Sequence, residues 1–171
     1  MFVADKMLVE TSFDAASTGL ISLAEGDGLA SVSEAAYREG MAGLHWPGVP
    51  ESKPVEPRLA GVRCHSLPES GEHVGLALRW EAIGPDGDLF PALDADIKLT
   101  RAGECTTELT VAGTYRPPAT LMAAGLDRAT VDPVATATIR SFLRRVAEAI
   151  SLLTLARPDG GERRQGQPPV P

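Results

Sequence analysis

The chain has 171 residues, 43% hydrophobic and 23% charged, which is typical of one globular domain rather than of a disordered chain. Its formal net charge of −7 argues against a nucleic-acid or anionic-membrane partner, because either would favour a concentrated basic face. The N-terminus has no signal-peptide pattern, and no apolar run approaches the roughly 20 residues that a membrane-spanning helix needs. We therefore expect a cytoplasmic protein.

The first part of the chain predicts one strand and two helices. Residues 3–11 alternate as a strand does, and Ser12 is placed to cap a helix whose apolar residues recur at helical spacing: Phe13, Ala16, Leu20 and Leu23. Gly26-Asp27-Gly28 ends that helix. Ser31 and Glu34 have the spacing of a capping box, which predicts a second helix that begins there and ends at Gly40.

Residues 44–57 contain four prolines and predict a loop, because proline lacks the amide that a central strand must donate. We interpret this segment as a connection; a lid over a pocket is the alternative.

The next part predicts an antiparallel meander. Strand signals cover residues 59–67, 73–83, 90–100 and 105–115, with a strong turn signal at 84–88 and a further turn at 102–104. Their clean alternation indicates one wet face and one buried face. We predict this inner face: Val62, Leu78, Trp80, Leu93, Ile97, Leu109, Val111 and Tyr115.

The last predicted element is a long amphipathic helix. Asp132 and Pro133 suit a cap and a first-turn proline, and the helix should run to about Leu155, a span of roughly 33 Å at 1.5 Å per residue. One stripe is apolar and should face the sheet: Ile139, Phe142, Val146 and Ile150. Residues 1–156 are thus predicted to be a single domain, and the Gly- and Pro-rich residues 157–171 a disordered tail.

Cys64 and Cys105 both fall on predicted strands. Two cysteines make no disulfide framework, so we predict free, buried thiols in a reducing compartment. A bridge between them stays geometrically open.

This order of elements is that of the α+β helix-grip fold, in which a curved antiparallel sheet wraps around a long C-terminal helix. The chain resembles the START-like or Bet v 1-like superfamily, which includes polyketide cyclases and dehydratases. Four segments are similar to an actinobacterial group within it: 75–82 (GLALRWEA), 89–96 (LFPALDAD), 113–118 (GTYRPP) and 134–140 (VATATIR). The resemblance implies the fold but leaves the function open, because the superfamily shares no catalytic motif. The Asp132-Pro133 pair departs from it and leaves open whether the helix starts late or kinks.

The candidate site residues are those expected to line a pocket between the sheet and the helix: Trp80, Tyr115, Thr107, Leu78, Phe142, Val146 and His45. An inward tryptophan or tyrosine needs a hydrogen-bond partner, which is a ligand in an open pocket and a backbone carbonyl in a filled core. His45 is either a general base at the pocket mouth or an exposed loop histidine.

No metal or cofactor is predicted. The sequence has no HExxH, CxxC, phosphate-binding glycine loop or GxSxG motif. Asp94 and Asp96 favour surface pairs with Arg79 over a metal site, because no histidine or cysteine is in register with them.

We keep three hypotheses for function. The first is binding of a small hydrophobic ligand, lipid-like or polyketide-like, and the second is an aromatase/cyclase or dehydratase that uses the same cavity. The third is an interaction protein with a filled core. The residues do not decide whether the protein is an enzyme, and we expect a monomer or a homodimer.

Overall fold

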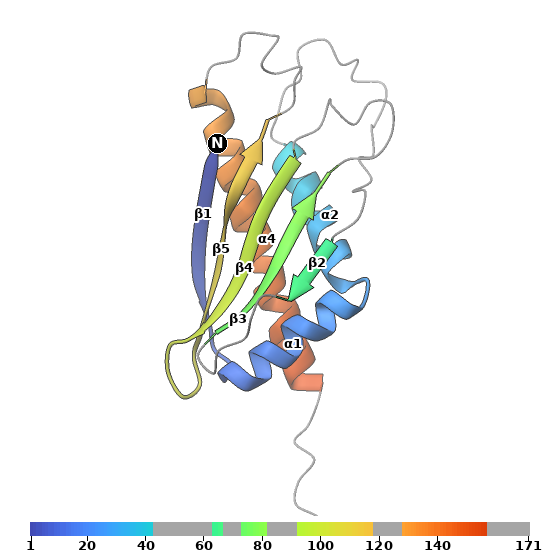
Figure 1. Ribbon diagram of the computed structural model, residues 1–171, viewed down its shortest axis with the longest axis vertical. Helices are drawn as coiled ribbons and strands as arrows, with labels where there is room; N and C mark the ends of the chain where they lie inside the picture. The colour runs from blue at the N-terminus through green and yellow to red at the C-terminus, as the bar shows by residue number, and fades with distance from the viewer. Residues whose placement is uncertain (43–62, 67–72, 82–91, 118–127, 157–171) are drawn as a thin grey trace, which may run out of the picture.

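The computed structural model describes residues 1–42, 63–66, 73–81, 92–117 and 128–156 (Figure 1). In chain order its elements are β1 (Phe2–Val9), α1 (Phe13–Glu25), α2 (Gly28–Ala42), β2 (Arg63–Ser66), β3 (His73–Trp80), β4 (Ala92–Arg101), β5 (Thr107–Arg116) and α4 (Arg128–Ala156). The predicted loop 44–57, Val62 and the tail 157–171 lie outside the described residues.

The described strands form one antiparallel sheet in the order β1-β5-β4-β3-β2. Strands β2 to β5 follow one another as a meander, and β1 from the start of the chain pairs with β5 at the sheet's edge. The predicted alternation is confirmed in β4, where Leu93, Ala95, Ile97 and Leu99 are buried while Asp94, Asp96 and Lys98 are exposed. One face of the sheet is therefore apolar and the other polar.

The three helices that the structure describes cover the apolar face, and α4 runs diagonally across it (Figure 1). All four residues of the predicted stripe on α4, Ile139, Phe142, Val146 and Ile150, are at most 1% exposed. The other predicted inner-face residues that the structure describes are buried as well. The arrangement of the elements therefore confirms the α+β helix-grip fold.

Two predicted helix starts are wrong. Helix α2 begins at Gly28, so Ser31 lies inside it, where its backbone N–H donates to the Asp27 carbonyl at 2.9 Å. Burial of Leu29 in the first turn explains the earlier start, because it adds an apolar contact that a start at Ser31 would lose. Helix α4 begins at Arg128, and Pro133 lies inside it rather than in its first turn.

Two further local predictions change. Ser12 is the N-cap residue of α1, as predicted, but its side chain makes no capping hydrogen bond. Cys105 is a free cysteine, yet it is exposed in the turn between β4 and β5 rather than buried on a strand. The turn carries it past the end of the sheet, where no helix covers it.

None of the described helices is long and apolar enough to cross a membrane.

Candidate functional site

Three side chains form a row across the inner face at one end of the sheet. The register pairs Trp80 of β3 with Leu93 of β4, and Leu93 with Tyr115 of β5. Residues directly opposite one another in an antiparallel sheet point to the same face. All three are at most 2% exposed, so the row lies under the helices.

Two helices add aromatic rings to this row. Phe142 of α4 meets Trp80 edge to face, with ring centroids 5.0 Å apart and planes at 83°. Tyr37 of α2 is 1% exposed and lies near enough to Tyr115 for the two phenols to interact electrostatically. We call Trp80, Tyr115, Phe142 and Tyr37 the aromatic cluster.

Both phenols of the aromatic cluster are held in their neutral form. Burial raises the pKa of Tyr115 above its ordinary value, because the phenolate would lose its hydration. Burial also raises the pKa of Tyr37, and the neighbouring Tyr115 raises it further. At neutral pH the two side chains therefore present hydroxyl groups rather than charges.

The indole N–H of Trp80 is a buried, unsatisfied hydrogen-bond donor among the described residues. The Ser33 hydroxyl, one helical turn before Tyr37, is in the same condition. A buried donor without an acceptor costs roughly 1–3 kcal/mol, and each such group needs an explanation.

The predicted site residues do not all converge. Leu78 and Val146 are both buried. Leu78 lies two residues before Trp80 on β3, and Val146 lies one helical turn after Phe142 on α4. Thr107 lies at the other end of β5, eight residues from Tyr115, a separation of roughly 26 Å along a strand. Its hydroxyl donates to the Thr11 carbonyl at 2.8 Å, so its donor is already used within the protein. His45 lies outside the described residues.

Among the side chains whose burial the structure gives, the fully buried ionisable residues are Tyr37 and Tyr115, while Asp132 and Arg145 are partly exposed residues with single buried atoms. The other buried polar residues among these side chains, apart from the aromatic cluster, are Thr11, Ser33, Thr107, Thr138 and Ser141. No group of three or more histidine, cysteine, aspartate or glutamate residues that could hold a metal occurs among the described residues.

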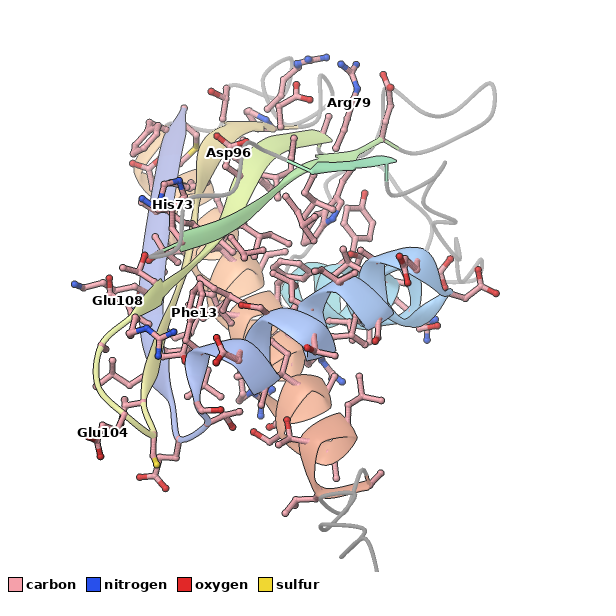
Figure 2. All side chains as sticks on the ribbon, turned by 60° about the horizontal axis from the view of Figure 1, so that its bottom comes forward. Phe13, His73, Arg79, Asp96, Glu104 and Glu108 are labelled. Atoms are coloured by element: carbon pink, nitrogen blue, oxygen red, sulfur yellow. The ribbon has the colours of Figure 1, made fainter. Side chains whose placement is uncertain are left out.

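Charged side chains gather on the other face of the sheet. Figure 2 shows Arg79 and Asp96 on the side away from the helices, and Phe13 on the side toward them. The predicted surface pairing is confirmed for Asp94, which lies 3.5 Å from the Arg79 guanidinium, and Glu81 lies 3.2 Å from the same group. The predicted pair of Arg79 with Asp96 stays a prediction. Exposed pairs of this kind contribute little to stability.

Two of the hollows that described residues line can be placed on the fold, and neither of these two lies between the sheet and the stripe of α4. One, of about 580 Å³, is on the polar face of the sheet, with Ala77, Asp96 and Ala112 among its lining residues. The other, of about 630 Å³, lies between α1 and the end of α4, beside Gly19 and Leu153.

Sequence reasoning missed Tyr37 and Ser33. A signal was present, because Leu29, Ser33, Ala36 and Tyr37 recur at i, i+4, i+7 and i+8, which is one face of a helix. The predicted helix start at Ser31 hid this face by cutting Leu29 from it.

No protein-family model and no curated protein matches the chain. Among solved structures, a conserved protein from Geobacillus kaustophilus is similar at 14% identity with a TM-score of 0.51, covering 89% of this chain and 96% of its own. A START superfamily protein from Mycobacterium smegmatis covers 89% and 98% at 12% identity, with a TM-score of 0.37. The Zhui aromatase/cyclase from Streptomyces sp. R1128 covers 95% and 99% at 12% identity, also with a TM-score of 0.37.

These identities bear on the fold alone, and the two lower TM-scores carry no argument about this chain. The element order and the likeness to the Geobacillus protein agree on one architecture. The chain has the α+β helix-grip fold, as the order of elements in the sequence predicted. The resemblance to the START-like superfamily stays a prediction. The narrower likeness to an actinobacterial group stays a prediction.

Proposed function

We propose that the protein binds a small hydrophobic molecule, lipid-like or polyketide-like, between the sheet and α4. The observation that carries the proposal is the buried Trp80 indole N–H, which has no acceptor among the described residues. A bound molecule that accepts this hydrogen bond would remove the cost of an unpaired donor. Apolar side chains from both layers, including Leu78 and Val146, would supply the contact surface.

The alternative is an aromatase/cyclase or dehydratase that uses the same space. General acid–base catalysis works best with a group whose pKa is near the working pH. The raised pKa of Tyr115 moves its phenol away from that range, so this residue suits hydrogen bonding better than proton transfer. This favours binding over catalysis at the aromatic cluster.

Native mass spectrometry of protein purified from its own host tests the proposal. We expect a small molecule to co-purify with the protein and to be released on unfolding. Absence of any such molecule, together with no thermal shift across a library of lipids and aromatic compounds, would refute ligand binding.

A pair of variants on α4 locates the binding. Val146→Phe adds bulk on the face that meets the sheet and should lower ligand occupancy, because that side chain is fully buried. Leu152→Phe makes a similar addition on the same helix where the side chain is 67% exposed, and it should leave occupancy unchanged. Circular dichroism melting checks that both variants are folded before occupancy is compared.

The remaining predictions belong to the same proposal. We propose a cytoplasmic location and a monomeric or homodimeric state from the sequence alone. We also propose that the protein has no nucleic-acid partner, and its net charge of −7 supports this.

A further inference from the structure

The polar groups of the aromatic cluster differ in what they can accept or donate. The Trp80 indole N–H is a donor only, whereas each tyrosine hydroxyl can donate and accept. A group that satisfies Trp80 must therefore be an acceptor. An aliphatic ammonium group has no acceptor and would leave the indole unpaired.

The absence of a free buried positive charge among the described side chains limits which chemical class of acceptor group can bind beside Trp80. Among the side chains whose burial the structure gives, no lysine, arginine or histidine is fully buried, and the partly buried Arg145 already binds Glu39. A carboxylate placed beside Trp80 would therefore have no free buried counter-charge among these side chains. Removing an ion from water without a partner is much more costly than removing a neutral carbonyl. The neutral state of Tyr37 and Tyr115 adds donors but no positive charge.

The position of Trp80 shows where the acceptor would sit. Trp80 and Tyr115 flank Leu93 across three strands, roughly 10 Å apart at the strand spacing of about 4.8 Å. The edge-to-face contact with Phe142 fixes the indole ring against α4. The acceptor therefore belongs at the end of the sheet that carries this row, and the apolar remainder of the molecule extends toward Leu78 and Val146.

We infer that the bound molecule is uncharged and carries a carbonyl oxygen, of a ketone, ester or amide, which accepts the hydrogen bond of Trp80 Nε1–H. This inference rests on the proposed function and names the ligand class for that site. It separates the ligand from free fatty acids and from organic cations.

Two matched sets of compounds test it. The lipid-like set shares one alkyl chain and comprises pentadecan-2-one, 2-methylpentadec-1-ene and tetradecanoate. The aromatic set comprises 2-acetylnaphthalene, 2-isopropenylnaphthalene and 2-naphthoate. In each set the alkene has nearly the same shape as the ketone but lacks the carbonyl oxygen that accepts a hydrogen bond. The carboxylate has acceptor oxygens but carries a negative charge.

The readout is the indole N–H resonance of Trp80 in ¹H–¹⁵N spectra, identified as the signal that Trp80→Phe removes. We expect the ketone of at least one set to move it downfield and to bind roughly three- to tenfold more tightly than its alkene, the range of one neutral hydrogen bond. The carboxylate should bind more weakly than the ketone. Trp80→Phe should remove the preference for ketone over alkene while leaving alkene affinity near its original value.

The outcomes distinguish the inference from the proposed function. Equal binding of ketone and alkene, with an unmoved indole resonance, would overturn the inference and leave hydrophobic binding intact. Tightest binding by the carboxylate would do the same. No binding by any member of either set would overturn both.

Discussion

Gly113 lies in β5 where the neighbouring strand leaves no room for a side chain. A Cβ built on it would lie 2.2 Å from the Asp94 carbonyl oxygen and 2.4 Å from the Ala95 Cα and Cβ atoms. These are backbone and near-backbone atoms, so the strands themselves would have to separate. Glycine is thus required here by the close approach of β4 and β5.

Gly113→Ala should therefore lower the free energy of unfolding by about 2–3 kcal/mol, the upper part of the range for overpacking. Chemical denaturation measures this directly. Gly103→Ala is the matched control, because its added Cβ would meet Thr106 at 3.7 Å, an ordinary contact. A loss of similar size in both variants would contradict the steric argument.

Thr107 was predicted as a ligand contact, but its hydroxyl already bonds to Thr11. Thr107→Val keeps the shape of the side chain and removes the buried hydrogen bond to the Thr11 carbonyl. We expect the free energy of unfolding to fall by about 1–2 kcal/mol, with ligand affinity unchanged.

Thr110→Val on the same strand, where the side chain is only half-buried, is the control and should change stability by less than about 0.5 kcal/mol. Lost ligand binding in Thr107→Val, without lost stability, would support the predicted pocket role of Thr107 and contradict this argument.

At the scale of elements, Glu39 links α2 to α4. Its carboxylate accepts hydrogen bonds from the Ser141 hydroxyl at 2.5 Å, from Arg145 at 3.0 Å and from Arg144 at 3.1 Å. The Ser141 hydrogen bond, followed by that of Arg145, lowers the pKa of Glu39. Three donors from one helix thus stabilise a single charged acceptor on another.

The direction of the Glu39 pKa shift determines how the stabilisation by its hydrogen bonds depends on pH. A lowered folded-state pKa means that the stabilisation is fully present above the unfolded value, roughly pH 4.3, and is lost as the pH falls through the folded value. The stability difference between the wild type and Glu39→Gln should be constant above about pH 5 and shrink at lower pH. Thermal melts from about pH 3 to pH 7 measure it. A difference that grows as the pH falls would contradict the assignment.

The elements divide into those that sequence could predict and those it could not. Strands β3 to β5 were predicted with their faces, because an antiparallel sheet with one solvent-exposed side keeps its alternation in the sequence. The starts of α2 and α4 were not, because local cap signals at Ser31 and Asp132 were outweighed by tertiary contacts such as the burial of Leu29. Local signals of this kind indicate where a helix can begin, and packing decides where it does.

The candidate site divides in the same way. Alternation placed Trp80, Tyr115 and Thr107 correctly on the inner face. Alternation could not predict the positions of these residues along the sheet. Those positions depend on the register between strands, which the turns and the neighbouring strands determine. The contact between Trp80 and Phe142 joins residues more than sixty positions apart in the sequence, and no local pattern predicts it.

At the scale of the molecule, the two tyrosines of the sequence occupy opposite layers of one interior. Tyr37 comes from the helical layer and Tyr115 from the sheet, and each is at most 2% exposed. Neither phenol can reach water unless these layers separate. Their ionisation therefore reports separation of the two layers, whether by unfolding or by an opening that admits a ligand.

Burial raises both folded-state pKa values above the unfolded value of about 10. The stabilisation is thus fully present below about pH 10 and is lost as the pH rises through the folded values, at roughly 1.4 kcal/mol per pH unit for each phenol. We expect the tyrosinate absorbance to appear in one cooperative step together with loss of helical circular dichroism, well above pH 10. A tyrosinate signal that reaches half its amplitude near pH 10 while the helices persist would show that one phenol is accessible in the folded protein, and the sealed aromatic cluster would then be wrong.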